Sequence, residues 1–126
     1  MTMPKILIVD DEQIIRTLIN HTLEPLEDNG VVIITAQDGE EALKIIKKDK
    51  PELVFLDIAM PEMDGFEVCD TVKNKLHMKG VHIIMVTGMG QEFDREKGIK
   101  SGCNFYITKP FSTEELRSKA REILGL

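Results

Sequence analysis

Five polar side chains lie directly after short apolar segments of the chain, or within two residues of one. They are the acids Asp10, Asp11 and Asp57, the hydroxyl of Thr87 and the amine of Lys109. If the apolar segments are parallel strands of one sheet, their carboxyl ends meet at one edge and these side chains share a crevice. Converging carboxylates repel one another and need positive charge among them. Lys109 offers one such charge, and Mg²⁺, which prefers carboxylate oxygens, would offer two more.

Phosphoryl transfer is the chemistry that these residues fit best. Asp57 is the single acid after the central apolar segment, which makes it the candidate nucleophile and phosphoacceptor, forming an aspartyl phosphate. A metal ion held mainly by Asp10 and Asp11 would shield the charge of Asp57 and stabilise the transferring group. Lys109 can neutralise one phosphoryl oxygen, and Thr87 can donate its hydroxyl to another. Taken singly, several of these residues could be turn or surface residues, but that interpretation requires several coincidences at one crevice.

The elements that would position these residues alternate between two hydrophobic patterns. Continuous apolar runs predict strands at 6–9, 31–34, 53–56, 82–86 and 105–107, and the β-branched run at 6–9 is typical of a strand that is covered on both faces. Apolar residues at helical spacing predict five helices, with these apolar faces: Ile14, Ile15, Leu18, Ile19 and Leu23; Ala42, Leu43 and Ile46; Phe66, Cys69, Val72 and Leu76; a weak face within 91–101; and Leu116, Ala120, Ile123 and Leu124. Ser112 and Glu115 form a capping box at the start of the last helix.

This alternation of five strands with five helices predicts an α/β fold, in which a parallel sheet carries helices on both faces. Right-handed crossovers and short loops favour a flavodoxin-like, doubly wound sheet with the strand order 2-1-3-4-5. The 126 residues contain no linker or repeat, so we expect one domain over residues 1–126, with its core at about 5–124.

Composition argues against several other classes of protein. The net charge of −6 and the isoelectric point near 5.1 argue against direct nucleic-acid binding. No apolar run approaches the ~18 residues that cross a bilayer, and the first residues lack the apolar core of a signal peptide. We therefore expect a cytoplasmic protein without membrane contact, in which Cys69 and Cys103 are free thiols.

Four segments of the chain carry the motifs of a known family. They are Ile8 to Glu12, Phe55 to Gly65, Val86 to Gly88 and Tyr106 to Phe111. On these segments the chain resembles the receiver domains of two-component response regulators, such as chemotaxis regulators, over nearly its whole length. The resemblance implies a signalling switch that takes its phosphoryl group from a histidine kinase or a small phosphodonor. It also implies that the domain catalyses only its own phosphorylation and dephosphorylation.

The resemblance further implies roles for individual residues. The implied ligands of Mg²⁺, or of Mn²⁺ in its place, are Asp11, Asp57, the backbone carbonyl of Ala59 and, through water, Asp10. Thr87 and Tyr106 match the family's switch pair, and the bond between Lys109 and Pro110 is expected to be cis.

Switching would act through the hydroxyl of Thr87, which moves toward the phosphoryl group and lets the ring of Tyr106 turn inward. The change would alter the surface formed by the fourth helix, the fifth strand and the fifth helix. That surface would control a partner protein or an attached output domain, and the family also allows a homodimer that forms on phosphorylation. We expect the chain to be either a stand-alone shuttle or an excised receiver, and the sequence leaves both open.

Three rival functions fit less well. A phosphatase of the haloacid-dehalogenase type needs a second acid two residues after its nucleophile, where this chain has Ala59. A flavin or nucleotide binder of similar fold needs a phosphate-binding loop where Asp10, Asp11 and Glu12 stand, and these acids repel phosphate. A receiver-like scaffold that is never phosphorylated would not need the complete set of reactive residues.

Gly88 departs from the family's usual pattern, in which this position is more often alanine. Gly88 and Gly90 should loosen the loop after the fourth strand. We therefore expect residues 88–102 to be the least stable part of the domain and the part that moves. Ala59 and Met89 flank the site without polar side-chain atoms that could orient water, which predicts slow self-dephosphorylation.

Overall fold

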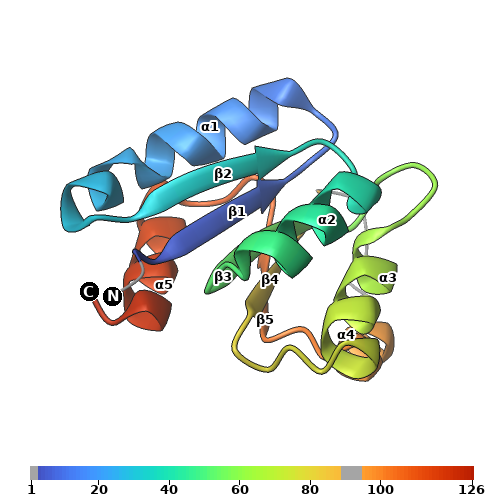
Figure 1. The fold of residues 1–126 in the computed structure, drawn as a ribbon. Helices are drawn as coiled ribbons and strands as arrows, with labels where there is room; N and C mark the ends of the chain where they lie inside the picture. The colour runs from blue at the N-terminus through green and yellow to red at the C-terminus, as the bar shows by residue number, and fades with distance from the viewer. Residues whose placement is uncertain (1–2, 89–94) are drawn as a thin grey trace.

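Five parallel strands form a single sheet at the centre of the molecule (Figure 1). The computed structural model describes residues 3–88 and 95–126. The strands are β1 (Lys5–Val9), β2 (Val32–Ala36), β3 (Leu53–Asp57), β4 (His82–Thr87) and β5 (Phe105–Thr108). They lie in the order β2-β1-β3-β4-β5, and every neighbouring pair is parallel. The predicted strand order and the predicted doubly wound α/β fold are therefore confirmed.

Helices connect the strands and cover both faces of the sheet. They are α1 (Gln13–Leu23), α2 (Gly39–Asp49), α3 (Gly65–Asp70), α4 (Arg95–Ser101) and α5 (Thr113–Leu124). A 3-10 helix (Glu24–Asn29) follows α1, and a π-helical segment (Thr71–Lys75) follows α3. α1 and α5 pack on one face, whereas α2 and α3 pack on the other (Figure 1). None of the described helices is long and apolar enough to cross a membrane.

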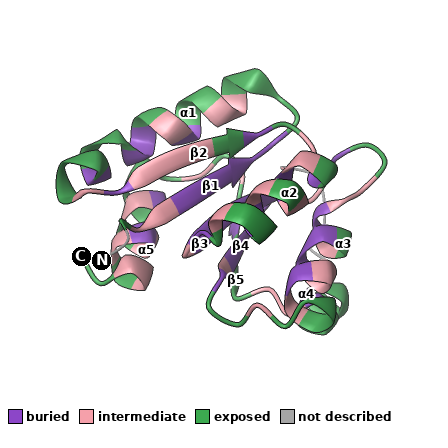
Figure 2. Cartoon of the chain, viewed as in Figure 1, coloured by how far each residue is buried: buried purple, intermediate pink, exposed green. Residues whose placement is uncertain are grey.

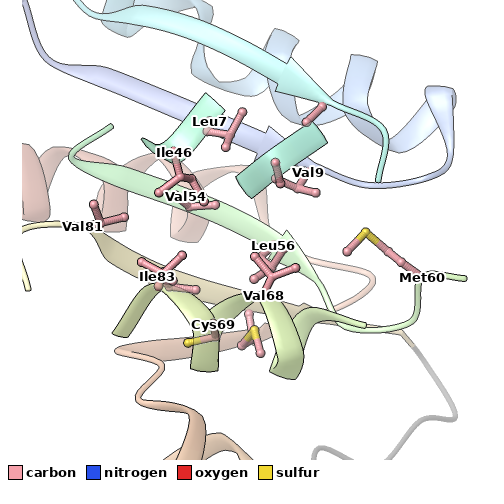
Figure 3. Packing of buried hydrophobic residues seen from close by; sticks show 14 residues of the cluster. Leu7, Val9, Ile46, Val54, Leu56, Met60, Val68, Cys69, Val81 and Ile83 are labelled. Carbon is pink, nitrogen blue, oxygen red and sulfur yellow. The ribbon is translucent and has the colours of Figure 1, made fainter. Parts of the chain in front are cut away.

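The sheet separates two hydrophobic cores, and its central strands are buried along most of their length (Figure 2). In β1, Leu7 and Val9 pack toward α2 and α3, while Ile6 and Ile8 pack toward α1 and α5. The alternation follows from strand geometry, in which successive side chains point to opposite faces. Figure 3 shows the first core, where Leu7 and Val9 lie among the side chains of α2, α3 and β3. This packing makes the sheet a rigid platform for the residues that follow its strands.

Three apolar side chains that we expected on buried helix faces are exposed, so this part of the sequence prediction is wrong. Ile14 and Leu18 of α1 are 80% and 45% exposed, and Leu76 is 39% exposed. α1 covers the sheet with a narrower stripe, in which Ile19 and Leu23 are buried. Leu76 directly follows the π-helical segment, whose wider turn shifts it away from the buried face.

Two smaller predictions are confirmed, namely Ser112 as the N-cap of the last helix and the two free thiols, whereas the reciprocal bond from the side chain of Glu115 stays a prediction. The side chain of Ser112 accepts a hydrogen bond from the backbone N–H of Glu115 at 3.3 Å, so Ser112 caps α5. Cys69 and Cys103 are both free thiols, and Cys69 is buried.

Some predictions fall on residues 89–94, which lie outside the described residues. They concern the start of the fourth helix at residue 91, the apolar side chain of Met89 and the loop glycine Gly90. The expected low stability of residues 88–102 depends in part on the same segment and stays a prediction.

Candidate functional site

Asp10 follows β1 and is almost fully buried, with 1% of its surface exposed. Its Oδ1 accepts a hydrogen bond from the backbone N–H of Glu12 at 2.9 Å, and its Oδ2 accepts one from Nζ of Lys109 at 2.9 Å. The backbone N–H of Asp10 donates to the carbonyl of Ala36, at the end of β2, over 3.2 Å. Groups from two parts of the chain therefore fix the carboxylate of Asp10, and a third fixes its backbone.

Lys109 connects the carboxyl ends of several strands. Its Nζ lies 2.9 Å from Oδ2 of Asp10 and 3.6 Å from Oδ1 of Asp57, the last residue of β3. Its backbone N–H donates to the carbonyl of Thr87, the last residue of β4, over 2.6 Å. The bond from Lys109 to Pro110 is cis, as expected. The structure thus brings together residues that are up to 99 positions apart in the sequence.

The surroundings of Asp57 disfavour its charged form. Asp57 is 4% exposed. Burial and the negative charges of Asp10 and Asp11 raise its pKa from 3.8 to about 7, against the opposing effect of Lys109. Burial acts to lower the pKa of Lys109, but the hydrogen bond with Asp10 and the charge of Asp57 raise it above its ordinary value. At neutral pH Lys109 is therefore charged, whereas Asp57 is only partly ionised unless more positive charge is nearby.

An acidic cluster lies next to this pair. One carboxylate oxygen from each of Asp10, Asp11 and Glu12 lies within 4.8 Å of the others. Oxygen donors at this spacing suit a hard divalent cation. Asp57 is not a member of this cluster, and Ala59, whose backbone carbonyl was an expected ligand, lies in an exposed position. Sequence reasoning missed Glu12 as a candidate ligand, although its position directly after two expected ligands is a usable signal.

Thr87 has a buried hydroxyl for which the described parts of the chain offer no hydrogen-bond partner. The residue is 1% exposed. A buried polar atom without a partner costs about 1–3 kcal/mol, and such atoms are rare in native proteins. Thr87, the last residue of β4, lies at the same edge of the sheet as Asp57, because Asp57 lies opposite Val86 in the pairing of β3 with β4. An oxygen of a group bound beside Asp57 would be a suitable partner for this hydroxyl.

Tyr106, the second residue of the expected switch pair, lies on β5 with 46% of its surface exposed. Its ring stacks on that of Phe105, with the ring centroids 6.2 Å apart. Thr108 of the same strand lies opposite Thr87, so Tyr106 is two positions from the residue that pairs with Thr87. The structure places Thr87 and Tyr106 on neighbouring strands, with the ring partly exposed. Their role as a switch pair and the inward movement of the ring stay predictions.

Comparison with known proteins points to one family. A family model described as the response regulator receiver domain matches residues 6–121. Among curated proteins, the alkaline phosphatase synthesis transcriptional regulatory protein PhoP of Bacillus subtilis is 43% identical over 120 residues. That match covers 95% of this chain and 48% of PhoP, and the chain spans about half the length of the curated relatives it matches.

Solved structures show the same likeness. The chemotaxis protein CheY4 of Vibrio cholerae is 33% identical with a TM-score of 0.82, over 97% of this chain and 99% of that chain. The receiver domain of the Francisella response regulator 1452 is 30% identical with a TM-score of 0.83, over 97% of each chain. Both structures share the fold described above along almost their whole length.

Proposed function

The chain belongs to the response regulator receiver domain family, whose general function is that of a phosphorylation-dependent signalling switch, and we propose that Asp57 is its phosphoacceptor. One observation carries the proposal. The buried carboxylate of Asp57 lies beside the amine of Lys109, at the sheet edge where the hydroxyl of Thr87 has no partner among the described residues. A phosphoryl group on Asp57 would give both Lys109 and Thr87 an oxygen to bind.

In the proposed reaction, a carboxylate oxygen of Asp57 attacks the phosphorus of a phosphohistidine in a histidine kinase. The new O–P bond forms as the P–N bond breaks, and the electron pair of the broken bond goes to the imidazole. A small phosphodonor would react in the same way with its own leaving group. Lys109 offsets the charge of one phosphoryl oxygen, and the hydroxyl of Thr87 donates to another. The domain would catalyse only this reaction and the later hydrolysis of its own aspartyl phosphate.

We further propose that Mg²⁺, or Mn²⁺ in its place, binds between the acidic cluster and Asp57. The residues that would hold the ion are Asp10, Asp11, Asp57 and the backbone carbonyl of Ala59. The fit rests on the donor set, because carboxylate oxygens gathered at one edge of the sheet are the ligands that hard cations prefer. When bound, the ion would supply positive charge to the phosphoryl oxygens. Glu12 is close enough to Asp10 and Asp11 to contribute as well.

The proposed output is a change in the surface formed by α4, β5 and α5. If the hydroxyl of Thr87 moves toward a phosphoryl oxygen, it leaves space into which the ring of Tyr106 can turn. The altered surface would then control a partner protein or an output domain. PhoP and the ycf27 protein of Guillardia theta are named as transcriptional regulators and are about twice as long as this chain. Their length supports an output domain joined to a receiver of about residues 5–124.

Intact-mass spectrometry tests the phosphoacceptor. The protein is incubated with acetyl phosphate and MgCl₂, and we expect the mass to rise by one phosphoryl group. Asp57→Asn should show no such rise, because the amide is not a nucleophile. Asp49→Asn is the matched control, since Asp49 lies at the end of α2 and pairs with Lys5 rather than with Lys109. Phosphoryl uptake by Asp57→Asn at the wild-type level would disprove the assignment.

A further inference from the structure

The backbone of Asp10 is held on both sides by hydrogen bonds. Its N–H donates to the carbonyl of Ala36 at 3.2 Å, and its own carbonyl accepts a hydrogen bond from a guanidinium nitrogen of Arg16 at 2.6 Å. The second distance is short for an N–H···O bond, and charged donors form the shorter and stronger bonds of this type. Arg16 therefore binds the backbone at Asp10, where the chain leaves β1 and the acidic cluster begins.

Arg16 is itself fixed in the first turn of α1. Its backbone N–H donates to the carbonyl of Glu12 at 3.1 Å. Its side chain is half-buried and lines a shallow cavity with Thr35, Ala36 and Glu41. The first helical turn and the guanidinium thus close a loop around Asp11 and Glu12. The side chains of those two residues are exposed, so their carboxylates depend on the backbone for their position.

The peptide geometry carries this restraint into the cluster. The carbonyl of Asp10 and the N–H of Asp11 belong to one rigid planar unit, so a hydrogen bond that fixes the carbonyl also fixes the plane from which Asp11 starts. On the other side of Asp10, Lys109 binds the carboxylate at 2.9 Å. Arg16 therefore orients the backbone of the cluster, while Lys109 orients the carboxylate of its first residue.

We propose that Arg16 is a positioning residue for the phosphoryl-transfer site, which acts through the carbonyl of Asp10 to hold the carboxylates of Asp11 and Glu12 in a cation-binding arrangement. The inference rests on the proposed function, because it requires that the acidic cluster binds a divalent cation. Residues that orient metal ligands typically change metal affinity by about 10–100-fold when they are replaced. Arg16 makes no direct contribution to the reacting atoms in this account.

Binding of Mn²⁺, followed by the electron paramagnetic resonance of the free ion, tests the proposal without any phosphodonor. In Arg16→Gln we expect the dissociation constant for Mn²⁺ to rise roughly tenfold. Arg117→Gln is the matched control, because Arg117 donates to the carbonyl of Thr22 at 3.5 Å, near the other end of α1. Both variants lose one guanidinium–carbonyl hydrogen bond and one positive charge, but only the first should weaken Mn²⁺ binding. Arg16→Lys keeps the charge without the planar guanidinium, and its affinity should stay below that of the wild type.

Each outcome bears on a different claim. Equal affinities of the wild type and Arg16→Gln, or an equal loss in Arg117→Gln, would overturn the positioning role of Arg16 and leave the proposed function standing. Partial recovery in Arg16→Lys would support it, because the lysine amine can donate to the same carbonyl without the fixed geometry of the guanidinium. If the wild type neither binds Mn²⁺ nor takes up a phosphoryl group from acetyl phosphate, the proposed function itself fails.

Discussion

The two edges of the parallel sheet differ in how well their charged and polar groups are paired. At the amino-terminal edge, the backbone N–H of Lys5 donates to Oε2 of Glu52 at 2.9 Å, and Nζ of Lys5 lies 3.3 Å from Oδ1 of Asp49. The carbonyl of Glu52 accepts a hydrogen bond from the N–H of His82 at 3.0 Å, which joins β3 to β4. The side chains of Lys5 and Asp49 are also partly exposed, so water shares the solvation of their charges. At this edge, Lys5, Asp49 and Glu52 therefore all have partners.

At the carboxyl-terminal edge, buried polar groups of the described residues are not fully paired. Asp10 and Asp57 are both buried and share the amine of Lys109. Burial and neighbouring negative charge raise the pKa of Asp57, and Thr87 keeps a buried hydroxyl without a partner in the described residues. Each of these features opposes folding on its own. The amino-terminal edge therefore stabilises the fold, whereas the carboxyl-terminal edge leaves interactions unmade that the proposed cation and phosphoryl group would complete.

Crowding the carboxyl-terminal edge should have the largest effect on stability. A methyl group at Gly65 would lie 2.5 Å from the backbone oxygen of Asp57 and 2.9 Å from Cα of Ile58. Because both atoms belong to the backbone, the strand end must shift, and we expect Gly65→Ala to lower the free energy of unfolding by about 3 kcal/mol. Urea denaturation measures the change. Gly80→Ala is the control, since a methyl group there meets nothing within 4 Å, and equal losses in both variants would contradict the expected crowding.

The pH dependence of stability should reveal that Asp57, at the carboxyl-terminal edge, lacks enough positive charge around it to be ionised. The raised pKa means that folded, metal-free protein keeps a proton on Asp57 that the unfolded chain releases above pH 3.8. The stability contributed by this proton is full below pH 3.8 and is lost as pH rises toward about 7. The asparagine in Asp57→Asn cannot titrate. In EDTA, the free energy of unfolding of this variant should therefore rise by about 2 kcal/mol relative to that of the wild type as the pH goes from about 5 to about 8. Parallel pH profiles of the two proteins in urea unfolding would show that Asp57 is not protonated in the fold.

Removing the hydroxyl without a partner should stabilise the protein. We expect Thr87→Val to raise the free energy of unfolding by about 1 kcal/mol, because a buried polar atom without a partner is replaced by a methyl group. Thr22→Val is the matched control, since Thr22 is also a buried residue but its hydroxyl donates to the carbonyl of Leu18 at 2.9 Å. That variant should lose about 1 kcal/mol instead. Thermal unfolding distinguishes the two, and a loss of stability in both would mean that Thr87 has a partner in the folded state.

The smallest effect on stability should come from a change at the amino-terminal edge. Asp49→Asn removes the ion pair with Lys5, but both side chains are partly exposed. We therefore expect a loss of only about 0.5 kcal/mol, which should shrink further in about 0.5 M KCl. Urea denaturation at low and high salt measures this change. A loss as large as that of Gly65→Ala would remove the contrast between the two edges.

The strand order could be predicted because the strands carry a strong local signal. Continuous apolar runs such as the one around Val54 mark strands that are buried on both faces, and the connection rules leave few ways to arrange five of them. The exposure of Ile14 and Leu18 could not be predicted in this way. Helical periodicity shows that a helix has an apolar side, but the packing of α1 on the sheet decides how much of that side is covered. The π-helical segment before Leu76 likewise has no local sequence signal that we recognise.

The candidate site shows the same division. The neighbourhood of Asp10, Asp57 and Lys109 follows from a general rule, because all three lie at the carboxyl ends of strands in a doubly wound sheet. The hydrogen bond from Arg16 to the carbonyl of Asp10 follows no such rule, since it depends on the path of a loop and on the reach of a long side chain. Residue types and topology therefore indicate which groups meet, whereas the groups that hold them in place become visible only in three dimensions.

The central claim is that Asp57 carries the phosphoryl group, and chemical mapping of the modified residue tests it most directly. Borohydride reduces an aspartyl phosphate to homoserine, which peptide mass spectrometry locates after treatment of the protein with acetyl phosphate and Mg²⁺. The account predicts homoserine in place of Asp57 and at no other position. Reduction at Asp11 or another residue, or an unreduced Asp57 in protein whose intact mass includes a phosphoryl group, would contradict it.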